Sequence, residues 1–330
     1  MTLSNSVSKS YYPGLDLLKF ILALLIIAAH CNLAAESSLL KELIGKITSI
    51  AVPLFFAISS FLFFGKIDQM EEAGQRPYLK KTIKRLLILF ILWYALMFPM
   101  TWQRFWRLAT LKESVYAILL SCSFNGYWFI KALIINTILL FLCRRGKGLV
   151  VFSAIALLVY LFWSYNYVYE YVSIPFSPYY SFYYHTAYFC SGALLARYYD
   201  KLSLIRIPSG ILIIIYLVVL LGSFFMPIGP IYRLISVFLI FPVFERMSIQ
   251  CDSLVTFRKM SIILYMVQFL LIWLYGRFSD SLFADDSLMY ITLHFSLVRY
   301  LIVTMTAIAI AGLILWLEKK PYLSFLSFLH

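Results

Sequence analysis

Two ionisable side chains, Lys19 and His30, stand within the first apolar segment of the chain, eleven residues apart. On an α-helix this spacing is about 20° beyond three full turns, so both residues fall on one face, roughly 16 Å apart along the axis. A basic group at one end of such a face can hold an anionic cofactor, and a histidine further along can exchange protons with a substrate. The structural alternative is a snorkelling lysine and a hydrogen-bonded interfacial histidine.

Other reactive side chains give weaker patterns. Cys31 adjoins His30 and can in principle carry an acyl group, but neighbouring residues on a helix do not face each other. Lys131 stands beside Trp128 in an apolar segment, where a charge needs a partner or a water-filled cavity. The five cysteines form no CxxC pair, and no P-loop, dinucleotide fingerprint or HExxH sequence occurs. We therefore predict no metal site and no nucleotide-driven chemistry.

The elements that must position these residues are membrane helices. Of the 330 residues, 63% are hydrophobic and 13% are charged, which is more apolar than a water-soluble core accommodates. We predict an all-α polytopic bundle of about ten transmembrane helices, forming a single domain over residues 1–330. The predicted spans are Leu15–Leu33, Ile47–Phe64, Leu86–Thr101, Tyr127–Cys143, Gly148–Tyr165, Phe182–Tyr199, Gly210–Met226, Ile231–Phe244, Ser261–Tyr275 and Arg299–Leu317. A shorter apolar stretch, Ser114–Asn125, is expected to be interfacial or re-entrant.

Lys and Arg are distributed unevenly between the connecting loops. With a cytoplasmic N-terminus, about twice as many fall on the inner side as on the outer side. This bias predicts an even number of spans with both termini in the cytoplasm. The net charge of +13 then reflects loop orientation and anionic membrane lipid rather than nucleic-acid binding. A signal peptide is the alternative interpretation of Phe20–Ala29, and the nearby Asp16 and His30 argue against it.

Several motifs resemble, in order, those of the acyltransferase-3 family of bacterial membrane O-acyltransferases. The first is a basic residue, ten further residues and a histidine, which Lys19 and His30 match. The later motifs are Val52–Phe61, Tyr78–Leu87, Tyr127–Leu133, Phe189–Leu195 and Ser261–Gln268. Each motif alone is weak, because apolar aromatic strings are common in membranes. The ordered set covers almost the whole chain and is far more specific.

The resemblance implies an enzyme that moves an acyl group, expected to be acetyl, from cytoplasmic acyl-CoA to a hydroxyl of a surface or lipid-linked glycan. It also implies a bacterial inner membrane. His30 is then the expected general base, because neutral imidazole can take the proton of the attacking hydroxyl. The expected acyl-CoA contacts are Lys19, Arg85 and Ser59. The expected substrate or cavity-lining residues are Trp128, Lys131, Tyr265 and Gln268. Positive-inside orientation is the alternative for Arg85, and helix packing for Ser59.

Two positions depart from the family pattern. Ser60 replaces a glycine, and serine is small enough to keep a close helix contact. Gln268 replaces a frequent histidine, and glutamine does not titrate near neutral pH. Two alternative functions follow: a transporter of a polysaccharide precursor or small anion, with Lys131, His30 and Arg233 lining its path, and a family member that binds acyl-CoA without catalysis. Arg233, Arg299 and Glu36 are expected toward the outer face.

Overall fold

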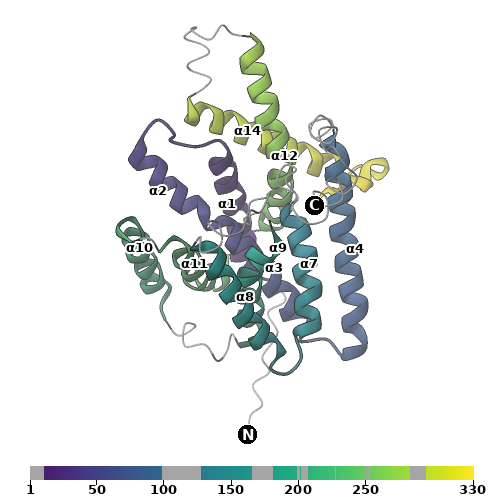
Figure 1. The fold of residues 1–330 in the computed structure, drawn as a ribbon. Coiled ribbons are helices and arrows are strands. Elements are labelled where there is room, and N and C mark those ends of the chain that lie inside the picture. Colours follow the sequence, from purple (N-terminus) through teal and green to yellow (C-terminus); the bar gives the residue numbers. More distant parts are fainter. Residues whose placement is uncertain are drawn as a thin grey trace, which may run out of the picture.

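A computed structural model gives the architecture of the chain (Figure 1). It describes residues 11–98, 128–165, 181–198, 201, 207–226, 228–249, 251, 253–282 and 295–330. All regular elements within these ranges are helices. They are α1 (Pro13–His30), α2 (Ser38–Ser49), α3 (Ala51–Ile67), α4 (Glu72–Leu96), α7 (Trp128–Cys143), α8 (Gly148–Ser164), α9 (Phe182–Tyr198), α10 (Ser209–Phe225), α11 (Gly229–Glu245), α12 (Ser253–Leu282), α14 (Ser296–Leu317) and the 3₁₀ helix η5 (Pro321–Leu329).

Each of the ten predicted apolar segments overlaps at least one helix within the described residues. Two helices extend well beyond the predicted segment: α4 begins at Glu72, and α12 occupies Ser253–Leu282. The extensions carry Lys, Arg, Gln and Leu, which are good helix formers. The Lys, Arg and Gln residues among them are too polar to lie in lipid but can continue a helix into water. The predicted second span is divided at Ile50, which separates α2 from α3. The stretch Ser114–Asn125 lies outside the described residues.

The helices have the length and surface of membrane elements. Stretches long and apolar enough to cross a bilayer are Pro13–His30, Ser38–Ile67, Ser253–Ser279 and Ser296–Leu317. Shorter apolar helices are Trp128–Cys143, Gly148–Ser164 and Ser209–Phe225. Large apolar side chains such as Leu158, Phe225 and Met305 point outward and are more than half exposed, which suits contact with lipid. The chain is an integral membrane protein, while about ten spans and two cytoplasmic termini stay predictions.

Contacts between side chains show the directions of the helices around α1. Phe20 stacks on Phe257 and His30 packs on Phe269, each with ring centroids 4.7 Å apart, so α1 and α12 run in parallel. Arg299, at the start of α14, reaches the carbonyl that follows His30. The helix α14 is therefore antiparallel to α1. In Figure 1 α1 lies inside the bundle, whereas α4 and α10 lie at opposite edges.

Two glycines allow helix backbones to approach closely in the core. A Cβ atom at Gly192 of α9 would lie 2.0 Å from the carbonyl oxygen of Ala57 on α3. A Cβ atom at Gly14 of α1 would lie 1.9 Å from the carbonyl oxygen of Phe244 on α11. Small residues at such crossings are a common device of membrane bundles, where packing rather than the hydrophobic effect joins helices. The contact of Gly14 with Phe244 places the end of α11 next to the start of α1.

Candidate active site

His30 is the last residue of α1 and its side chain is exposed. Its imidazole meets the ring of Phe269 on α12 nearly edge-on, with an interplanar angle of 62°. Within the described part of the chain, no hydrogen bond holds either ring nitrogen of His30. After His30 the backbone leaves the helix, with positive φ angles of 50° at Asn32 and 63° at Ala34. Such strain in a non-glycine residue is typical of functional sites.

The turn that follows His30 is fastened to the start of α14 by two charged residues. Arg299 donates hydrogen bonds from Nε, at 3.0 Å, and from a terminal nitrogen to the carbonyl oxygen of Cys31. In the other direction, the Glu36 carboxylate accepts hydrogen bonds from the hydroxyl and the backbone N–H of Ser296. Each charge complements the dipole of the helix end that it contacts. The Ser296 hydrogen bonds, the hydroxyl first, lower the pKa of Glu36.

Lys19, at the opposite end of α1, belongs to a group of charges around Asp16. The Lys19 ammonium lies 3.1 Å from one carboxylate oxygen of Asp16, and an Arg258 guanidinium nitrogen lies 3.8 Å from the other. Arg85 and Arg258 are both near enough to repel Lys19. Two cations thus contact one buried carboxylate, and a third, Arg85, lies near Lys19. The excess of positive charge makes this end of α1 suited to an anion.

Arg85 is also held by the last residues of the chain. Its guanidinium donates to the carbonyl oxygen of His330 at 3.2 Å, and the indole of Trp93 donates to the carbonyl oxygen of Leu329 at 3.2 Å. These bonds fix η5 against α4. Lys259, which follows Arg258, pairs with Glu318 at 2.5 Å, so one further basic residue extends the charged region around Lys19.

A row of aromatic rings connects His30 with the interior of the bundle. Phe269 packs on Tyr265 with centroids 6.3 Å apart, and Tyr265 packs on Phe129 at 5.3 Å. Phe129 in turn lies 4.7 Å from Phe56 of α3. The row therefore links residues of α1, α12, α7 and α3. Of the predicted site residues, Tyr265 lies in this row with His30, and Trp128 packs on its Phe129 and Phe56, each with centroids 6.3 Å apart.

The family comparison covers nearly the complete chain. A profile of the acyltransferase-3 family, described as an acyltransferase domain, matches residues 12–327. The chain belongs to the acyltransferase-3 family. Searches of curated proteins and of solved structures each return no match. The predicted resemblance is thus confirmed over the part that contains α1, the aromatic row and η5.

The two departures of this acyltransferase from the family pattern are both fully buried. Gln268 donates from Nε2 to the carbonyl oxygen of Tyr265 at 3.0 Å. Its Oε1, like the hydroxyl of Ser60, has no hydrogen-bond partner among the described residues. An unpaired buried polar atom has a free-energy cost, so each is a position where a water or substrate atom would be stabilising. Gln268 is buried beside the row of aromatic rings, next to Phe269 in the sequence, and does not reach an open surface.

The remaining predicted residues of the acyltransferase lie apart from these groups or deeper in the bundle. Trp128 is buried and stacks on His185, with centroids 4.5 Å apart. Lys131 is half-buried on α7, three residues beyond Trp128. Ser59 is half-buried on α3 and makes no hydrogen bond with a described residue. Cys31 is fully buried, and burial in apolar surroundings disfavours the reactive thiolate, which argues against an acyl-cysteine step.

Sequence reasoning missed two charged or titratable members of these groups. His185 is fully buried on α9, between the rings of Phe56 and Trp128, and a single histidine in an aromatic run carries no spacing signal. Arg258 belongs to no motif of the sequence and is one of many basic residues between the apolar segments. Its contact with Asp16 depends on the packing of α12 against α1. The resulting site of the acyltransferase has a cationic group at one end of α1 and an exposed imidazole at the other.

Proposed function

We propose that this membrane acyltransferase moves an acetyl group from acetyl-CoA to a hydroxyl of a surface or lipid-linked glycan, with His30 as the general base. One observation carries the proposal: an exposed imidazole ends the same helix on which Lys19 and Asp16 gather cations at the other end. A sugar hydroxyl has a high pKa and needs proton removal as it attacks, whereas a thioester is already activated. Neutral imidazole serves that step.

The donor would bind at the Lys19 end, with its phosphates near Lys19, Arg258 and Arg85. Asp16 keeps the Lys19 ammonium in place, so the site is partly preorganised before the donor arrives. The roughly 16 Å between Lys19 and His30 along the helix is a distance that the flexible arm of coenzyme A, between its phosphates and its thiol, can cover. The thioester would then lie in reach of His30.

In the reaction, His30 would take the proton as the hydroxyl oxygen attacks the thioester carbonyl. The carbon–sulfur bond would break, and the coenzyme A thiolate would leave and take up a proton. The exposed side of His30 gives the acceptor access from the end of the bundle opposite the donor charges. We also propose about ten crossings with both termini in the cytoplasm, which the uneven distribution of Lys and Arg between the loops supports, and a bacterial inner membrane, which the family supports. Membrane lipid is then a partner, and no metal or nucleic acid is required.

The test is transfer from labelled acetyl-CoA in membranes that contain the chain, compared with membranes that lack it. Host glycan is supplied to both, and free coenzyme A is measured beside labelled glycan. We expect the chain to increase both products in equal amounts. Coenzyme A release without labelled glycan would contradict the glycan acceptor. No coenzyme A release from acetyl-CoA or from longer acyl-CoA donors would contradict the enzyme.

A further inference from the structure

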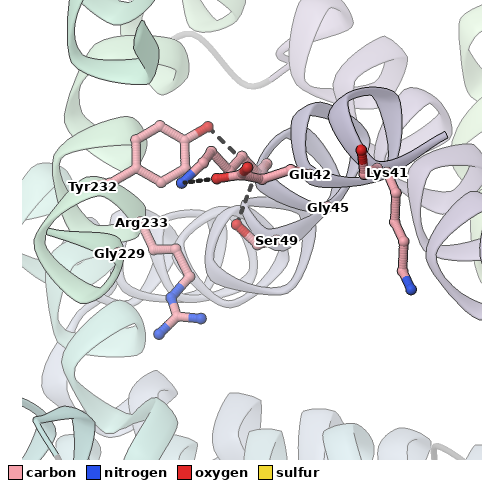
Figure 2. A pocket seen from close by; sticks show the side chains of 9 residues that line it. Lys41, Glu42, Gly45, Ser49, Gly229, Tyr232 and Arg233 are labelled. Carbon is pink, nitrogen blue, oxygen red and sulfur yellow. Dashed lines mark hydrogen bonds and ion pairs between the residues drawn. The ribbon is translucent and has the colours of Figure 1, made fainter. Parts of the chain in front are cut away.

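A second feature lies at the His30 end of the bundle: an open pocket of about 550 Å³ between α2 and α11 (Figure 2). Its volume is within the range of small-molecule sites. None of its residues belongs to the groups described around Lys19 or His30. The pocket is lined by Ser38, Lys41, Glu42, Gly45, Lys46, Ser49, Gly229, Tyr232 and Arg233.

The lining carries more positive than negative charge. It holds Lys41, Lys46 and Arg233 against the single carboxylate of Glu42. Figure 2 shows Arg233 and Lys41 extending toward the same side of the view, with Ser49 between them. Because three cations face one anion, a ligand with one or two negative charges would neutralise the pocket.

Two of the three cations, Lys46 and Arg233, are held in place before any ligand binds. Lys46 donates to the carbonyl oxygen of Ser223 at 2.7 Å and lies 3.4 Å from Glu42. Arg233 donates a hydrogen bond to the Tyr184 hydroxyl at 3.1 Å and also hydrogen-bonds Tyr160, and its buried Nε has no partner among the described residues. A guanidinium with donors left over can bind a phosphate through two hydrogen bonds.

The surroundings of the pocket are apolar. Lys46 lies 4.7 Å above the ring of Phe224 on α10. Phe225, the next residue, is 86% exposed, and Met226 is 62% exposed. A ligand here would have its anion in the pocket and its apolar part along the lipid-facing side of α10. This combination of charge and surface fits an amphiphile rather than a free anion.

We propose that this pocket binds the phosphate of a lipid that carries the acceptor glycan. The proposal rests on the proposed function, because the lipid would present its sugar hydroxyl at the end of α1 where His30 is exposed. The turn of residues 31–37 connects His30 directly to α2. The proposal therefore requires the bound lipid to extend its glycan along α2, past Ser38 of the pocket, to the general base.

The experiment measures binding to the purified full-length chain in detergent, without acyl-CoA. The probes are a short-chain phosphatidic acid, the diacylglycerol with the same chains, and inorganic phosphate. Gly45 lines the pocket, so the side chain of Gly45→Leu would fill part of it. The variant should fold, because a Cβ at Gly45 meets no atom within 4 Å. Gly65→Leu is the matched control, since Gly65 has the same open space and lies outside the pocket.

We expect phosphatidic acid to bind the wild type, and Gly45→Leu to weaken binding about tenfold or more through the clash, with Gly65→Leu unchanged. Arg233→Gln should weaken binding about tenfold through the lost charged hydrogen bonds, and Arg277→Gln should not. Equal binding of diacylglycerol, equal competition by inorganic phosphate, or unchanged binding to Gly45→Leu would overturn the proposal. Acetyl transfer is measured separately, so transfer without lipid binding would reject the pocket alone, and lipid binding without transfer would reject the enzyme alone.

Discussion

Arg299 binds the carbonyl oxygen of Cys31, the residue directly after His30. A guanidinium on α14 therefore holds the backbone directly after His30, while the imidazole itself packs on Phe269. The contact joins residues 268 positions apart in the sequence. It also offsets the negative end of the α1 dipole, where a cation is stabilising.

Replacement of Arg299 should lower kcat and leave the KM for acetyl-CoA unchanged. Arg299→Gln removes both charged hydrogen bonds to Cys31, and a displacement of about 1 Å at the base lowers kcat by about 100-fold. Arg299→Lys keeps the charge but loses the two-pronged contact, so we expect an intermediate rate. The measurement is kcat and KM for acetyl-CoA, with Arg277→Gln as the control. A changed KM with an unchanged kcat would contradict a positioning role.

Lys19→Gln should weaken donor binding. It removes one of the cations around Asp16, and we expect KM for acetyl-CoA to rise about tenfold, the effect of a lost charged hydrogen bond. Because the lost interaction is electrostatic, the variant should also respond less to added salt than the wild type. Kinetics at two ionic strengths test both effects. An unchanged KM and salt dependence would remove Lys19 from the donor site.

Glu36 should make stability depend on acid pH. Its folded pKa is lowered by the hydrogen bonds from Ser296. The stabilisation is therefore complete above the ordinary glutamate pKa of 4.5 and is lost as the pH falls through the lowered folded value. Glu36→Gln should melt at a lower temperature than the wild type at neutral pH and converge with it in stronger acid. Equal melting temperatures at neutral pH would contradict the contact.

Gly192→Ala should lower the yield of folded protein. The added Cβ would lie 2.0 Å from the carbonyl oxygen of Ala57, and this backbone atom cannot move aside without separating α3 from α9. Overpacking of this kind costs about 1–3 kcal/mol. Gly65→Ala is the control, because no atom lies within 4 Å of the added carbon. Thermal unfolding in detergent would compare them, and equal stability would show that the two helices are less tightly packed.

Helix positions were predictable from the sequence because lipid imposes apolar runs of defined length. The ends of α4 and α12 were not, since a helix can continue into water when its residues are good helix formers. The division at Ile50 was also not predicted, although Pro53 in the first turn of α3 is a residue typical of the start of a helix. Among the residues that the structure describes, four helical stretches satisfy both length and hydropathy, fewer than the ten apolar segments.

The site was predictable in part. The spacing of Lys19 and His30 identified one helix with chemistry at each end, and the structure places both residues on α1. Their partners were not predictable, because Arg258, Phe269 and Arg299 reach α1 only through the packing of α12 and α14. The pocket between α2 and α11 was missed for the same reason.

The most direct measurement compares acetyl transfer to glycan by the wild type and by His30→Ala at matched expression, together with acetyl-CoA binding to each. We expect the variant to lose about 100-fold or more of the transfer rate, the usual contribution of a general base, while its affinity for acetyl-CoA stays the same. Transfer by the variant at the wild-type rate would contradict the assignment of His30 as the base.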